Sequence, residues 1–167
     1  MTISFTTARR LPANAAVVAY GINSDELNSL PAGFNSTQLK KLGFKGEIGQ
    51  VQILPEGNKL IAAVGLGDSK EITPTKLRSA AAALARATRR HSSLATDLVA
   101  SSNIETTQAV QSVVEGIALA LYKFDYKSSS TRNKEDEALK KVILAGSTSS
   151  ATNSALSKAT SVVEGVM

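Results

Sequence analysis

The chain contains no cysteine and no tryptophan, and its only histidine is His91. Without cysteine the chain can form no disulfide, no thiolate nucleophile and no cysteine-ligated metal site, a composition that fits a reducing cytosol. With one histidine, a zinc site would need several converging carboxylates, and the acidic residues are scattered along the sequence. His91 follows a basic helical pattern, where it would complement the negative end of the helix dipole. The sequence therefore offers no metal site of its own.

Long apolar runs are missing as well. No segment reaches the ~18 uninterrupted apolar residues that a membrane-spanning helix needs. The N-terminus, MTISFTTARRLP, has no apolar run behind a basic start, as a signal peptide would. The GxSxG motif of serine hydrolases does not occur either. We therefore expect a cytoplasmic chain with no membrane partner.

Aromatic residues make up only 4% of the sequence, so alanine, valine and leucine must build the core of what we expect to be one domain. Strand patterns cover Ile3–Phe5, Ala15–Tyr20, Ile48–Leu54, Lys59–Val64, Ser93–Ala100 and Lys141–Ala145. Helix patterns cover Ser36–Leu42, Pro74–His91, Thr107–Tyr122 and Ala151–Met167. Alternating strands and helices predict an α/β fold with a mixed, mostly parallel sheet and helices on both faces. The PEGN turn adds one antiparallel hairpin.

The helix expected over Pro74–His91 has the clearest signals. Thr73 is a suitable N-cap for it, and Pro74 stands at the first helical position, where proline is tolerated. For the earlier short helix, Ser36 is a suitable N-cap. Apolar positions recur at steps of three and four residues and predict a buried stripe of Leu77, Ala81, Leu84 and Thr88. In the last expected helix, Leu156, Val163 and Val166 are the apolar positions.

The same helix is basic, and no acidic residue interrupts it between Lys76 and His91. The net charge of +5 is compatible with an anionic partner. The arginines of this helix, which recur at helical spacing, are candidate contacts to phosphate or DNA: Arg78, Arg86, Arg89 and Arg90. Alternatively, cations near a helix C-terminus simply complement the dipole. No interleaved aromatic residues support nucleic-acid binding, so both interpretations stay open.

A glycine pair, Gly65 and Gly67, follows a strand and precedes a helix, where backbone N–H groups can hold a phosphate. The stretch GLGDSKEITP does not continue as GxGxxG or as GxxxxGK[ST], and Asp68 would repel an anion. A tight exit from the strand is the preferred interpretation.

The stretch VVEGIALALYKFDYKSSS, from Val113 to Ser130, ends a helix in a polar run. We interpret it as a helix exit in which Leu119, Tyr122 and Phe124 complete the core and Gly116 allows a neighbouring element to approach closely. The alternative is a contact patch for another domain or subunit: Tyr122, Phe124, Tyr126 and Lys127. The pentapeptide SVVEG occurs at Ser112–Gly116 and again at Ser161–Gly165; its surroundings differ, and we interpret it as a shared helical pattern, not a repeat.

Four stretches in order resemble one family: GFKGEIGQVQIL, KLIAAVGLGDSKEITPTKLRSAAAALARA, VVEGIALALYKFDYKS and KVILAG. They look like the N-terminal domain of the leucyl aminopeptidases, also called cytosol aminopeptidases (peptidase family M17). Each motif alone is weak, and their order and spacing carry the resemblance, which covers the chain from about Phe34 to Met167.

The resemblance implies a three-layer α/β/α, macro-domain-like module over residues 1–150 and, over 151–167, the start of a helix leading to a catalytic domain. In the family that domain carries two divalent metals, zinc or manganese, and removes N-terminal amino acids, preferably leucine, within a homo-hexamer. The family's metal-binding motif, of the form NTDAEGRL, and its catalytic lysine and arginine do not occur in these 167 residues. No catalytic residue, metal ligand or cofactor is therefore assigned to this chain.

The resemblance thus predicts a non-catalytic domain that serves assembly and substrate access, with its own C-terminal catalytic domain as partner. In some bacterial members the domain contributes to DNA binding. The alternative function is a stand-alone nucleic-acid or nucleotide binding module that uses the basic helix 76–91.

Overall fold

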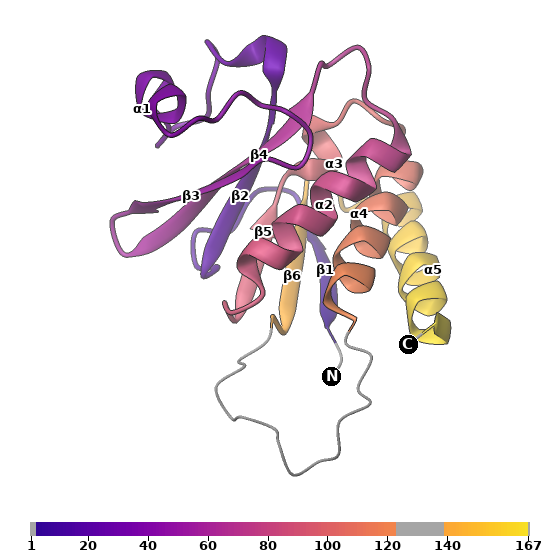
Figure 1. Cartoon of the computed structure of the whole chain (residues 1–167). Helices are drawn as coiled ribbons and strands as arrows, with labels where there is room; N and C mark the ends of the chain where they lie inside the picture. Colours follow the sequence, from indigo (N-terminus) through magenta and orange to yellow (C-terminus); the bar gives the residue numbers. More distant parts are fainter. Residues whose placement is uncertain (1–2, 123–138, 167) are drawn as a thin grey trace.

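The computed structural model describes residues 3–122 and 139–166. In this part of the chain six strands form one sheet in the order β1-β6-β5-β2-β4-β3 (Figure 1). The strands are β1 Ser4–Ala8, β2 Val17–Asn23, β3 Val51–Glu56, β4 Lys59–Gly67, β5 Ser93–Thr96 and β6 Lys141–Ala145. Neighbouring strands run parallel except in the β3–β4 hairpin. The helices are η1 Ser24–Glu26, α1 Ser36–Lys41, α2 Pro74–Thr88, α3 Leu98–Ser101, α4 Thr106–Leu121 and α5 Ser150–Val166.

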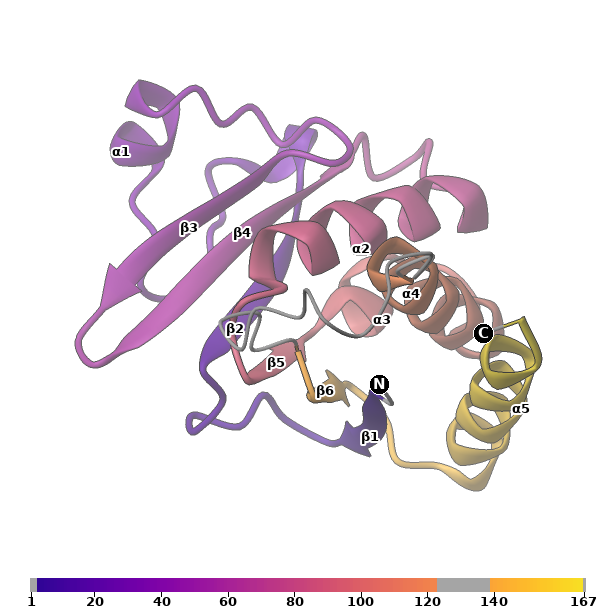
Figure 2. The same cartoon turned by 60° about the horizontal axis from the view of Figure 1, so that its bottom comes forward.

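One face of the sheet carries the main core beneath α2, α4 and α5, which lie in a row (Figure 2). Side chains alternate along a strand, so Val17 and Ala19 of β2 face this layer and Val18 and Ile22 face the other. The helical contribution is dominated by alanine, valine and leucine, as the lack of aromatics requires. The stripe expected on α2 is confirmed, because Leu77, Ala81, Leu84 and Thr88 are all buried.

The opposite face is covered by α1 and by the irregular segments around it. Leu39 of α1 and Phe44 pack against Ile61 of β4 and other apolar strand residues. Leu11, in the connection from β1 to β2, packs against the β2 and β5 residues Val18 and Ala95. The predicted α/β class, with a mixed and mostly parallel sheet in a three-layer α/β/α arrangement, is confirmed.

Helices α2 and α4 touch along an unusually close line at Gly116. A Cβ atom placed on Gly116 would collide with the backbone oxygen of Arg78 and would lie 3.0 Å from Cβ of Ala81. The absence of a side chain is therefore a condition of this packing, as the sequence predicted. No helix in the described part of the chain is long and apolar enough to cross a membrane.

Several local predictions were wrong. The strand expected over Ser93–Ala100 ends at Thr96, and the apolar residues that follow form the helical turn α3, because a short apolar run does not distinguish a strand from a buried turn. The N-cap of α1 is Asn35, whose side chain accepts from the N–H of Gln38 at 3.2 Å, not Ser36. Helix α2 ends at Thr88, short of His91.

The expected core residues at the ends of α4 and α5 are also partly wrong. Leu119 is 47% exposed and Tyr122 is 40% exposed, so neither completes the core. Val163 is buried, but Val166 points to solvent. Leu119 continues the solvent-facing row of α4 that begins at Gln111, which the apolar run of the sequence conceals. Phe124 lies outside the described residues.

Candidate functional site

Arg78 is held by an acidic residue from another helix. Its guanidinium Nη2 lies 2.8 Å from Oε2 of Glu115 on α4, and its Nε donates to the same oxygen at 3.0 Å. The other carboxylate oxygen accepts from the side chain of Gln111 at 2.9 Å. Helix α2 itself contains no acidic residue, and the one that pairs with Arg78 lies 37 residues further along the sequence. Arg78 is thus engaged in joining α2 to α4.

The remaining candidates lie at the C-terminal end of α2 and just beyond it. Arg86, Arg89 and Arg90 are exposed, and within residues 3–122 and 139–166 none of them forms an ion pair. The turn after the helix is fixed by the segment before β6: Leu139 donates its N–H to the oxygen of Arg89 at 3.0 Å, and Lys140 donates to that of Ser92 at 3.1 Å. Cationic residues from two distant segments therefore share one end of the molecule.

The glycine pair cannot offer its N–H groups to a phosphate. Strand β4 runs through Gly67, the N–H of Gly65 donates to the oxygen of Gln50 and that of Gly67 to the oxygen of Gly46, both at 2.8 Å. A Cβ atom on Gly65 would collide with the backbone oxygen of Glu47. The glycines are needed because another segment crosses the strand here, which agrees with the preferred structural interpretation.

The carboxyl ends of β2 and β5 form the switch point of the sheet. The chain leaves β2 towards α1 on one face and leaves β5 towards α4 on the other, which in open α/β sheets creates a ligand crevice. Here the space over Gly21 is taken by the side chains of Ser101, Leu66 and Leu98. The protein's own side chains therefore pack directly against the strand at Gly21.

The carboxylate of Asp97 also contacts Gly21. Oδ1 of Asp97 accepts the N–H of Gly21 at 2.8 Å and lies 3.3 Å from the hydroxyl of Ser101. Burial raises the pKa of Asp97 from its ordinary value of 3.8 to about 6, against the opposing effect of these hydrogen bonds. The sequence analysis missed Asp97, since it fell inside a segment assigned to a strand.

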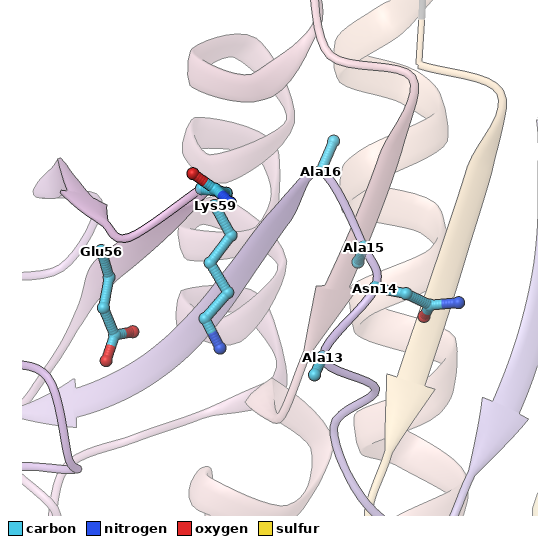
Figure 3. Close-up of a pocket in the computed structure, with 7 residues that line it drawn as sticks. Ala13, Asn14, Ala15, Ala16, Glu56 and Lys59 are labelled. Carbon is cyan, nitrogen blue, oxygen red and sulfur yellow. The ribbon is translucent and has the colours of Figure 1, made fainter.

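A hollow in the described surface lies at the opposite end of the sheet. A cavity of about 430 Å³ is bounded by residues 13–16 before β2 and by the turn of the β3–β4 hairpin. Figure 3 shows the side chain of Lys59 extending into it, with the carboxylate of Glu56 to one side and the Asn14 side chain turned away. None of the sequence-predicted site residues lines this cavity.

A second, smaller hollow of about 240 Å³ is lined by residues of α4 and α5, which pack against each other in the main core. Its lining combines polar residues of α4 with apolar residues and one lysine of α5: Thr107, Gln111, Ala155, Lys158, Ala159 and Val162. Of the aromatic contact patch that the sequence suggested, Tyr122 follows α4, whereas Phe124, Tyr126 and Lys127 lie outside the described residues. That patch stays a prediction.

The described residues do not fit a metal site. Nowhere in residues 3–122 and 139–166 do three His, Cys, Asp or Glu side chains gather so that they could hold a metal ion. No chemical step through a metal is therefore derived for this chain.

The model of the N-terminal domain of the cytosol aminopeptidase family matches residues 10–130. A probable cytosol aminopeptidase of Prochlorococcus marinus (strain MIT 9313) is 34% identical over 102 residues, which are 59% of this chain and 21% of that protein. One of Geotalea uraniireducens (strain Rf4) is 34% identical over 120 residues, 67% of this chain and 24% of that protein. The chain thus spans about a quarter or less of the curated relatives it matches.

Two solved structures show the same fold in longer proteins. The bottromycin maturation enzyme BotP in complex with Mn is 26% identical, with a TM-score of 0.68, over 90% of this chain and 30% of that one. A mutant tomato leucine aminopeptidase is 20% identical, with a TM-score of 0.80, over 99% of this chain and 37% of that one. The second likeness concerns the fold alone.

Proposed function

Because this chain belongs to the cytosol aminopeptidase family, as its N-terminal domain, we propose that it is the non-catalytic part of a metal-dependent aminopeptidase. The observation that carries the proposal is the match of the family's N-terminal domain to residues 10–130. The matched relatives are peptidases in which this domain is a minor fraction of the protein.

The full-length protein, on this proposal, removes N-terminal amino acids from peptides in the cytoplasm, with a preference for leucine. Its catalytic domain holds two divalent metals, zinc or manganese. The support comes from the names of the similar proteins, which are probable cytosol aminopeptidases and BotP in complex with Mn. The present chain contributes assembly of a homo-hexamer and control of substrate access, with its own C-terminal catalytic domain as its first partner.

Two measurements test this proposal. The gene is sequenced beyond the codon for Met167, and we expect the reading frame to continue into the family's metal-binding motif. The purified 167-residue chain and the full-length protein are then assayed on leucyl amides with zinc or manganese added. We expect turnover from the full-length protein only; turnover from the short chain would contradict a non-catalytic domain, and an inactive full-length protein would contradict the aminopeptidase.

A second candidate function is contact with DNA through Arg86, Arg89 and Arg90. The observation in its favour is that these arginines, which form no ion pair with residues 3–122 or 139–166, share one end of the molecule with the segment carrying Lys140 and Lys141. We expect duplex DNA to bind at ~50 mM salt and to be released steeply as salt rises, because released counterions drive such binding. Replacing Arg86 and Arg89 by alanine should weaken binding for all sequences alike, and Arg78→Ala is the control, since Arg78 is paired with Glu115. No binding at ~50 mM salt excludes this candidate.

A further inference from the structure

The pentapeptide SVVEG occurs on two helices, and only one copy is covered. On α4, Ser112, Val113 and Gly116 are buried. On α5, the equivalent residues Ser161, Val162 and Gly165 are exposed. The serine, the first valine and the glycine of the pentapeptide are therefore covered on one helix and exposed to solvent on the other, whereas its second valine, Val114 or Val163, is buried in both.

The covered copy shows how the pentapeptide receives a helix. Helix α2 crosses α4 so closely at Gly116 that the backbone oxygen of Arg78 occupies the place of a Cβ atom. The adjacent Glu115 then pairs with the guanidinium of the same residue at 2.8 Å. At neighbouring positions, the glycine thus lets the second helix approach closely and the glutamate binds a cationic side chain of that helix.

The uncovered copy keeps each of these features without a partner. Apart from its chain neighbours and the backbone of its own helix, no described atom lies within 4 Å of a Cβ atom placed on Gly165, and Glu164 is exposed and forms no ion pair with the described residues. Gly165 does not serve as a left-handed C-cap, because its φ is not positive and it lies within α5. Glycine is a poorer helix former than alanine, and no described neighbour of Gly165 comes so close that a side chain could not be accommodated there.

Exposed apolar side chains gather at the same end of the helical layer. Val162 and Val166 of α5 and Leu119 of α4 are among the few large apolar residues that are exposed, at 54%, 62% and 47%. The C-terminal ends of α4 and α5 lie on the same side of the molecule in both views (Figures 1 and 2). Such a concentration is typical of a surface that another element covers.

We propose that the face of Ser161, Val162, Glu164 and Gly165 receives a helix, as Ser112–Gly116 receives α2. The occupant is a helix of the polypeptide that follows this domain in full-length family members, with small residues at the crossing and an arginine or lysine that reaches Glu164. This rests on the proposed function. It is favoured because the matched relatives are several times longer than this N-terminal domain, and the following polypeptide begins at the end of α5, beside this face.

The test places a bulky side chain on the face in two proteins. Gly165→Leu in the 167-residue chain should leave the thermal midpoint unchanged or higher, because nothing lies near and leucine is the better helix former. In the full-length protein the same change should speed tryptic cleavage after the exposed Lys158 by about tenfold, the factor for a loss of about 1.4 kcal/mol of docking free energy. Equal cleavage of variant and wild-type full-length protein would overturn the proposal.

Two further variants keep the test decisive if the leucine variant does not fold. Val162→Asp should accelerate cleavage in the full-length protein, and Leu42→Asp is its matched control, because Leu42 is similarly exposed, at 48% against 54%, but lies beside α1. Glu164→Gln should act in the same direction, more weakly. If the short chain dimerises and Val162→Asp makes it monomeric, a second copy is the occupant and the proposal is wrong.

The outcomes also separate this proposal from the proposed function. An active full-length aminopeptidase that is insensitive to Gly165→Leu would overturn the docking face alone. A full-length protein without peptidase activity, in which Gly165→Leu still speeds tryptic cleavage of α5, would overturn the enzyme function alone. A reading frame that stops after Met167 would overturn both.

Discussion

The carboxylate of Asp97 holds the backbone of Gly21 across the sheet, with Oδ1 2.8 Å from the donating N–H. The contact joins the end of β5 to the neighbouring strand β2. Burial of the carboxyl group, which outweighs the opposing effect of this hydrogen bond on its pKa, makes the stability of the fold dependent on pH.

The first prediction concerns Asp97→Asn. The pKa of Asp97 is raised from 3.8 to about 6 in the folded state, so its contribution to stability is fully present below pH ~4 and is lost as pH rises through about 6. The loss is about 3 kcal/mol, from a pKa shift of about two units at ~1.4 kcal/mol each. Asparagine keeps an acceptor for Gly21 and carries no charge. Between pH 4 and pH 8, urea denaturation should show the variant gaining about this much relative to wild type.

The matched control is Asp25→Asn, for which the sign is reversed. Oδ1 and Oδ2 of Asp25 accept hydrogen bonds from the N–H and the hydroxyl of Ser69, and these lower the pKa of Asp25. Its contribution is present above its ordinary pKa and is lost as the pH falls. If the two variants changed stability with pH in the same direction, our account of Asp97 would be wrong.

A pair of glycine variants tests the packing of α2 on α4. Gly116→Ala places a Cβ atom against the backbone oxygen of Arg78, which forces the helices apart and should cost about 1–3 kcal/mol. Gly165→Ala meets open space and should stabilise the short chain by up to about 1 kcal/mol. Chemical denaturation of both variants measures the difference, and equal effects would show that close helix approach does not determine the cost at Gly116.

The ion pair between Arg78 and Glu115 should be worth little by itself. The Arg78 side chain is 40% exposed to water, which screens the pair, so a double-mutant cycle with alanine at both positions should give a coupling free energy of about 1 kcal/mol or less. Arg86→Ala, which breaks no ion pair in the described structure, should change the free energy of unfolding by less than about 0.5 kcal/mol. A coupling of several kcal/mol would mean that the pair is far better shielded than its exposure indicates.

The start of α2 provides a further test. The hydroxyl of Thr73 accepts the N–H of Lys76 at 3.2 Å, and Thr73→Ala should destabilise the chain by about 1 kcal/mol. Thr75→Ala is the control, because Thr75 is exposed within the first turn and alanine is the better helix former there. Thermal denaturation should therefore show a lower midpoint for the first variant only.

Local patterns predicted the elements that depend on neighbouring residues. The cap and buried stripe of α2, the β3–β4 hairpin and the bounds of β6 at Lys141–Ala145 follow from propensity, periodicity and turn residues. They could be read from the sequence because their causes lie within a few residues of each other.

The contacts that distinguish this domain could not be read in this way. Asp97 meets Gly21 from 76 residues away, and Glu115 meets Arg78 from 37 residues away. Nor does an apolar run show which of its members face solvent, and so Leu119 was expected in the core. For the candidate site, the basic residues stay a prediction, and only the fold shows that Arg78 is paired with Glu115, whereas Arg86 forms no ion pair with the described residues.

The pairing of β1 with β6 sets the order in which the domain can be completed during synthesis. Ser4–Ala8 aligns with Lys141–Ala145. Strand β1, the first to leave the ribosome, therefore has no pairing partner until β6, the last strand, has been synthesised. Until then β5 also lacks the partner on its outer side, because β6 lies between it and β1. In a nascent chain that stalls before residue 141, β1 therefore has no strand to pair with, and the outer edge of β5 stays exposed. Chaperones that recognise exposed strands would meet this domain in that interval.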